Sequence, residues 1–154
     1  MKLTAFIASA ILFAIACGSD KEPATQSSEV PITGTWKLLT GTLIEKGDTI
    51  VTDYTRNTSF IKIINPTHFA FFNHDLHKGK DSAAVFSAGG GTYTLKDSIY
   101  KEYLEYCTAR DWEGHDFEFT VTIKNDTLIQ SGIEVVESAG INRMNIEKYV
   151  RLKQ

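Results

Sequence analysis

The chain has 154 residues, of which 42% are hydrophobic and 23% are charged, and its formal net charge is −3. This acidic balance and the lack of a basic cluster argue against nucleic acid as a partner. Residues 33–154 are enough for one domain with one hydrophobic core.

Residues 1–16 have the pattern of a bacterial export signal. Lys2 is the only charged residue before Asp20, and an apolar run over residues 5–16 follows it, with Ser9 as the one polar interruption. Such a run is too short to span a bilayer comfortably as a permanent anchor. The segment Ala14-Ile15-Ala16-Cys17 resembles the bacterial lipobox, with Ala14 where that pattern usually has Leu. The resemblance implies that Cys17 becomes the lipidated N-terminus. The alternatives are an ordinary secretory signal cut near Ala16 and a membrane anchor.

Residues 18–32 are rich in Ser, Thr, Glu, Lys and Pro, and we interpret residues 17–32 as a lipidated cysteine followed by a flexible tether. The acidic residues just after Cys17 resemble the tag that exports some Bacteroidetes lipoproteins to the cell surface. We therefore expect a lipid anchor in the outer membrane, at its periplasmic or its cell-surface face. With Cys17 lipidated, Cys107 has no partner for a disulfide, and we expect it to be a small buried hydrophobe.

The remaining chain has the pattern of many short strands. Turn signals such as Lys46-Gly47-Asp48 and Asn125-Asp126 separate segments of alternating or continuous apolar residues. Gly89-Gly90-Gly91 indicates a bend or bulge in a long strand. Residues 73–82 are predicted to form a loop, and residues 108–116 a loop or a short helical turn. The predicted strands cover residues 34–40, 49–52, 59–64, 68–72, 85–95, 98–107, 117–123, 127–132 and roughly 145–152.

About eight to ten such strands without a long amphipathic helix predict an all-β domain, either an antiparallel sandwich or a closed barrel. A succession of hairpins favours the antiparallel up-and-down β-barrel. Closure of the barrel also removes the exposed edges that so many strands would otherwise present.

Gly34-Thr35-Trp36 opens the first predicted strand, and Arg151 lies in the last. This pairing resembles the calycin pattern of lipocalins and fatty-acid-binding proteins, in which an Arg packs across a Trp ring at the closed end of the barrel. The resemblance implies a lipocalin-like fold with Gly34, Trp36 and Arg151 as a structural plug. Residues 91–95, 102–106 and 124–132 are similar to the lipocalin-like lipoproteins common in Bacteroidetes.

A barrel of this kind can hold one small ligand in its mouth. Alternation along residues 98–107 places Tyr100, Glu102, Leu104 and Tyr106 on the same face of the strand as Ser98. If this face lines the barrel, its aromatic rings and its carboxylate suit a ligand with an apolar body and a hydrogen-bond donor. The alternatives are that this face points to solvent, or that Glu102 pairs with an internal Arg or Lys for structural reasons. The candidate ligand-binding residues are Tyr93, Tyr100, Glu102, Leu104, Tyr106 and Phe119.

No metal or cofactor site is expected. His74, Asp75 and His77 fall in a predicted loop without a second cluster of ligands, and we interpret them as solvated. No nucleophile or phosphate-binding motif stands out, so an enzyme is not expected.

Three functions remain open. The first is a carrier or sensor for a small hydrophobic or amphipathic molecule. The second is an interaction module whose barrel is filled with side chains and whose loops bind a protein or glycan, and the third is an enzyme that uses the cavity. Interior volume separates the first two, because large inward aromatics fill a small barrel. We expect a monomer, and the aromatics to inspect are Phe69, Phe71, Phe117 and Phe119.

Overall fold

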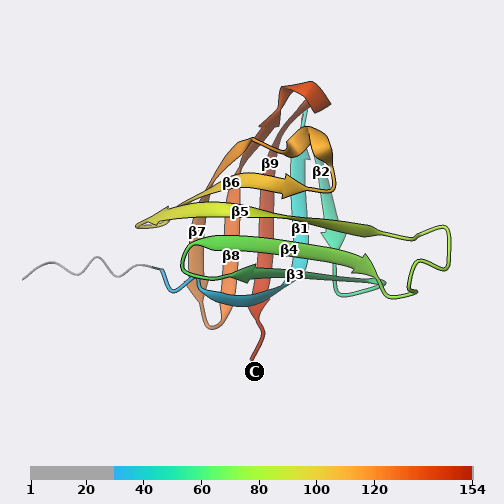
Figure 1. The fold of residues 1–154 in the computed structure, drawn as a ribbon, viewed down its shortest axis with the longest axis horizontal. Coiled ribbons are helices and arrows are strands. Elements are labelled where there is room, and N and C mark those ends of the chain that lie inside the picture. The colour runs from blue at the N-terminus through green and yellow to red at the C-terminus, as the bar shows by residue number, and fades with distance from the viewer. Residues whose placement is uncertain (1–29, 154) are drawn as a thin grey trace, which may run out of the picture.

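The computed structural model describes residues 30–153, which form nine strands and two 3-10 turns (Figure 1). The expected signal peptide, Cys17 and the tether as far as residue 29 lie outside the described residues. The elements are β1 (Gly34–Glu45), β2 (Asp48–Asp53), β3 (Thr58–Ile64), β4 (His68–Asp75), β5 (Phe86–Lys96), β6 (Ile99–Cys107), η1 (Arg110–Trp112), β7 (Asp116–Lys124), β8 (Thr127–Val136), η2 (Glu137–Ala139) and β9 (Ile141–Arg151).

The strands close into an antiparallel up-and-down barrel, which confirms the predicted fold class. The sheet order is β2-β1-β3-β4-β5-β6-β7-β8-β9, and β9 pairs again with β1. Strand β1 pairs with β3 over its first residues, Gly34–Lys37, and with β2 over its last, Thr40–Glu45. Eight strands therefore form the closed ring and β2 is an extra strand beside it, an arrangement compatible with a lipocalin-like fold. In Figure 1, strands β3–β6 cross in front of the remaining strands.

The two ends of the barrel differ. At one end the chain enters at Gly34, and short turns join β3 to β4, β5 to β6 and β7 to β8. At the other end lie longer connections, which include residues 76–85 and the η1 and η2 turns, and these two turns contact each other.

Trp36 closes the first of these ends. Its side chain is 0% exposed, and its indole Nε1 donates a hydrogen bond to the carbonyl of Ile32 at 2.7 Å. The Arg151 guanidinium lies over the ring and donates to the carbonyls of Pro31 and Thr33, at 2.7 and 2.6 Å. A Cβ on Gly34, whose φ is +144°, would lie 2.4 Å from Arg151 Nη1. A glycine is therefore required here, and the barrel's packing includes the residues just before position 33.

Gly89, Gly90 and Gly91 let strand β5 approach its neighbours closely. A Cβ on Gly90 would lie 2.6 Å from the carbonyl oxygen of Phe69 on β4, and one on Gly91 would lie 1.9 Å from that of Tyr103 on β6. The β5–β6 register shifts between Gly90 and Gly91, where Glu105 is the extra residue on β6. The expected bulge is present, and it lies opposite the glycines.

Four strand ends differ from the prediction by three or more residues. Strand β1 continues to Glu45 and β8 to Val136, although they were predicted to end at residues 40 and 132. Strand β4 continues to Asp75, although residues 73–82 were expected to form a loop. Strand β9 begins at Ile141, earlier than the expected start near residue 145. Its first residues include Asn142, Arg143 and Asn145, which hide the apolar pattern, yet they pair in register with β8.

Candidate functional site: a cavity in the barrel

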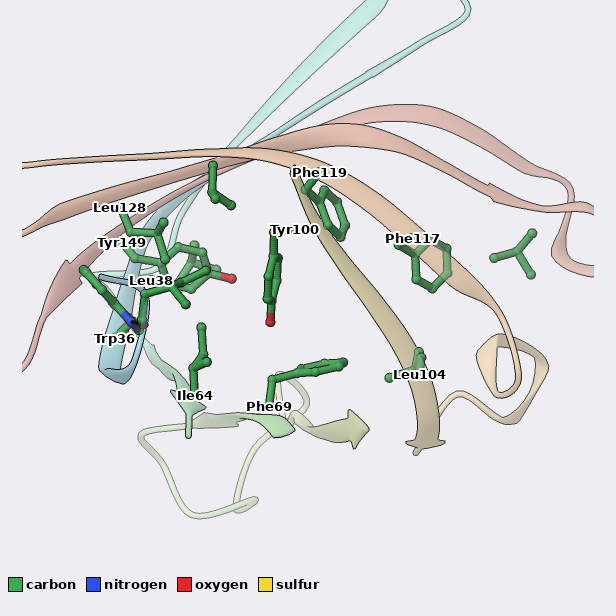
Figure 2. Close-up of a cluster of buried hydrophobic side chains, with 13 residues drawn as sticks. Trp36, Leu38, Ile64, Phe69, Tyr100, Leu104, Phe117, Phe119, Leu128 and Tyr149 are labelled. Carbon is green, nitrogen blue, oxygen red and sulfur yellow. Dashed lines mark hydrogen bonds between the residues drawn. The ribbon is translucent and has the colours of Figure 1, made fainter. Parts of the chain in front are cut away.

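The half of the barrel away from Trp36 holds a cavity of about 310 Å³. Residues from all eight strands of the ring line it. Its rim includes Thr52, Thr108 and Ala109, which are exposed, so the cavity opens at the end with the long connections. In Figure 2, Trp36 and Leu38 lie at one end of the buried cluster and Leu104 and Phe117 at the other. The barrel is thus filled at one end and hollow at the other.

Aromatic rings form much of the cavity wall. Phe60 stacks on Phe71 at a centroid distance of 5.7 Å, and Tyr54 meets Phe60 edge-on at 5.7 Å. Trp112, from the η1 turn, packs against Phe117 at 5.5 Å. These rings offer the apolar surface that a small-molecule site commonly presents.

A buried ion pair lies at the floor of the cavity. Lys62, which is 3% exposed, pairs with Glu102 and donates a hydrogen bond to Gln130 Oε1 at 3.0 Å. Its ammonium also lies 5.3 Å from the ring centroid of Phe69 and 5.5 Å from that of Tyr100. Burial raises the pKa of Glu102, and the Lys62 charge opposes this shift. The ammonium and the carboxylate therefore satisfy each other, one of the alternatives considered for Glu102 from the sequence.

A second ionic cluster lies near the mouth. Arg143 Nε donates to Glu134 Oε2 at 2.8 Å, and Asn145 Nδ2 donates to Glu134 Oε1 at 2.7 Å. The Arg143 guanidinium also lies 5.3 Å from the ring centroid of Trp112. Burial raises the pKa of Glu134, whereas Arg143 lowers it. Both carboxylate oxygens of Glu134 are thereby satisfied within the protein.

A third carboxylate, Glu147, lines the cavity between these two clusters. Its Oε2 accepts a hydrogen bond of 2.7 Å from the Tyr149 hydroxyl. Burial, and after it the negative charge of Glu147, raise the pKa of Tyr149. The cavity therefore combines an apolar wall with five charged side chains at defined positions: Lys62, Glu102, Glu134, Arg143 and Glu147.

The six candidate residues from the sequence do not all line the cavity. Glu102, Leu104 and Phe119 line the cavity. Tyr100 is fully buried in the core, and its hydroxyl makes no hydrogen bond of normal geometry with a described residue. Tyr93 packs against Tyr100 at 5.1 Å and donates to the carbonyl of Asn65 near the closed end.

Tyr106 lies outside the barrel, where its side chain is 69% exposed. The bulge at Glu105 interrupts the alternation of β6, so Cys107 faces the cavity in its place. Cys107 is half-buried at the lining.

Most of the polar lining was not anticipated from the sequence. Lys62 follows Phe60 and precedes Ile64 at the period of two that marks an inward face. Gln130 and Glu134 alternate in the same way with Leu128 and Val136 on β8. A polar residue at an inward position of an otherwise apolar strand is the sequence signal that could have identified these cavity-lining residues. The residues missed are Lys62, Gln130, Glu134, Arg143, Asn145 and Glu147.

The histidine-rich loop has internal partners. The Asp75 carboxylate accepts the backbone N–H groups of His77, Gly79 and Val85, and the His77 ring pairs with Asp81. Within residues 30–153, no three His, Cys, Asp or Glu side chains are grouped so that they could hold a metal ion. In the same range, no helix has the length and apolar character needed to cross a membrane.

Comparison of the chain with models of known protein families finds no match, and comparison with curated proteins finds none either.

Proposed function

We propose that this chain is a membrane-anchored lipoprotein whose barrel binds a small, mainly apolar ligand, as a carrier or a sensor and not as an enzyme. The observation that carries the proposal is the cavity of about 310 Å³, which is open at one end and walled by aromatic rings. Its volume falls at the lower end of the range typical of small-molecule sites.

The distribution of aromatics favours this proposal over an interaction module with a filled barrel. Phe69 does not line the cavity, whereas Phe71, Phe117 and Phe119 border it and leave it open. A barrel whose interior served stability alone would gain from filling such a space, because cavities cost free energy.

The proposed anchor suits the direction in which the cavity opens. Pro31 and Thr33 accept hydrogen bonds from Arg151 at the closed end, so the chain enters the barrel opposite the cavity mouth. A lipid on Cys17 would attach the barrel from its closed side. We place the protein at the outer membrane, on its periplasmic or its cell-surface face.

Native mass spectrometry tests ligand binding. Wild-type protein purified from its own host is expected to carry a small-molecule adduct. The variant Ser87→Phe, which adds a ring at the cavity lining, is expected to lose that adduct while keeping the far-ultraviolet circular dichroism spectrum of the wild type. Repeated absence of an adduct from the wild type, or equal occupancy in the two proteins, would contradict the proposal.

Labelling tests the anchor separately. Cells grown with radioactive palmitate are expected to label the wild type and not Cys17→Ala, and only the wild type should sediment with membranes. An unlabelled wild type would overturn the lipoprotein proposal and leave ligand binding unaffected.

A further inference from the structure

The cavity lining contains more negatively than positively charged side chains. Three carboxylates and two cationic groups line it. Lys62 pairs with Glu102, and Arg143 pairs with Glu134. Each pair contributes no net charge, since an ammonium or guanidinium and a carboxylate in contact cancel.

Glu147 is the carboxylate left over. It accepts a hydrogen bond from the neutral hydroxyl of Tyr149, and among residues 30–153 no Lys or Arg forms an ion pair with it. Its negative charge adds to the effect of burial in raising the pKa of Tyr54. A half-buried carboxylate that forms no ion pair with a Lys or Arg of the described residues favours a positively charged group on the ligand.

Aromatic side chains share the cavity with Glu147. Glu147 pairs in register with Gly41 on β1, and a Cβ on Gly41 would lie only 3.1 Å from the Tyr54 ring. The glycine therefore leaves room for that ring. Tyr54 packs against Phe60, and Phe60 lies 6.5 Å from Tyr149, whose hydroxyl contacts Glu147. Aromatic rings and a carboxylate within one cavity form a setting that recognises organic cations.

We infer that the ligand carries an organic cationic group, such as a primary or substituted ammonium, that binds at Glu147 among the rings of Tyr54, Phe60 and Tyr149. Its apolar body then packs against the opposite wall, which includes Leu104 and Phe117. This inference rests on the proposed function and names the chemical class of the ligand.

The same geometry argues against an anionic ligand such as a carboxylate. Lys62 is engaged by Glu102 and Gln130, and Arg143 by Glu134. An incoming anion would have to break one of these buried pairs and would also meet the charge of Glu147. Breaking a buried pair leaves a charge without compensation, which is strongly unfavourable.

Three probes of matched shape test the inference: 4-phenylbutylammonium, 4-phenylbutan-1-ol and 4-phenylbutanoate. Each is titrated calorimetrically into the mature chain with Cys17→Ser, which avoids lipid and detergent. The wild-type barrel is expected to bind the ammonium at least about tenfold more tightly than the alcohol, and the carboxylate most weakly. In Glu147→Gln, the ammonium should lose about that factor, while the affinity for the alcohol should stay within about twofold.

The matched control is Glu118→Gln. It removes one carboxylate from an exposed, outward position on β7, beside the inward Phe117 and Phe119, and should leave all three affinities unchanged. Alcohol or carboxylate binding as tight as that of the ammonium would overturn the inference and leave the proposed function standing. Absence of binding for all three probes would count against both. The ranking in the wild type decides the question even if Glu147→Gln fails to fold.

Discussion

The Arg151 guanidinium carbon lies 4.1 Å from the ring centroid of Trp36. A side chain at the end of the last strand therefore covers an indole near the start of the first strand. The contact joins β9 to β1, the pairing that closes the ring. It also fixes residues 31–33, whose carbonyls accept hydrogen bonds from Arg151 and Trp36. One cation–aromatic contact therefore links the start, the end and the closure of the barrel.

Replacing this indole should be costly. Trp36→Ala is expected to lower the free energy of unfolding by about 3–5 kcal/mol, because it removes a fully buried aromatic. Denaturant titration measures the change. Trp112→Ala, which removes a half-buried Trp at the mouth, is the control and should cost less. A loss below about 1 kcal/mol for Trp36→Ala would show that this end is not closed by the indole.

Gly91 should not tolerate a side chain. Gly91→Ala places a Cβ against the Tyr103 carbonyl, so strands β5 and β6 must separate at the bulge. We expect a loss of about 1–3 kcal/mol or more in urea unfolding. Thr94→Ala, at an exposed position on the same strand, should change stability by less than about 0.5 kcal/mol. Equal losses in the two variants would contradict the close approach of the strands.

The buried Lys62–Glu102 pair should behave as a unit. Lys62→Met leaves Glu102 buried without its cation and is expected to cost about 3–5 kcal/mol, whereas Lys62→Met combined with Glu102→Leu should recover most of that loss. A double-mutant cycle in denaturant gives the coupling energy. The partly exposed pair Lys101–Asp116, at 2.9 Å on the outside of the barrel, is the control and should couple by less than about 1 kcal/mol. Additive losses at Lys62 and Glu102 would refute the pairing.

The loop at the mouth offers a test by titration. The Asp81 carboxylate raises the pKa of His77 above its ordinary value of 6.5, because it accepts a hydrogen bond from the ring. A raised pKa means that the folded state holds the proton more tightly. The resulting stabilisation is fully present below pH 6.5 and is lost as the pH rises through the pKa of folded His77. An NMR titration should show that the pKa of His77 is lower in Asp81→Asn than in the wild type. An unchanged value would mean that the pair does not form in solution.

The fold could be predicted because most strands carry a clear apolar alternation. Phe117, Phe119 and Val121 are all buried, and the exposed residues between them complete the period of two. Turn signals between such segments predicted hairpins, and a succession of hairpins favoured the up-and-down barrel. The β9 start was missed because Arg143 and Asn145 point inward to bind Glu134, and polar residues at inward positions look like loop in sequence.

The candidate site was less predictable because it depends on pairing between distant strands. Glu102 could be placed inward by alternation, but its partner Lys62 lies 40 positions earlier and no local pattern joins them. Tyr106 was placed on the same inward face, yet the bulge at Glu105 turns it outward, and that bulge forms only when β6 meets Gly90 and Gly91. The excess charge of Glu147 likewise emerges only when β9 closes the ring.

We propose that the half of the barrel away from Trp36 is a binding cavity and that the other half is not. Methyl NMR with 4-phenylbutan-1-ol distinguishes the two halves. Leu43 and Leu104 line the cavity, whereas Leu38 and Leu128 lie in the packed end. We predict saturable shifts at the methyl groups of Leu43 and Leu104 with little change at Leu38 and Leu128. Shifts confined to outward-facing Ile133 and Val135, or no saturable shift at all, would contradict the claim.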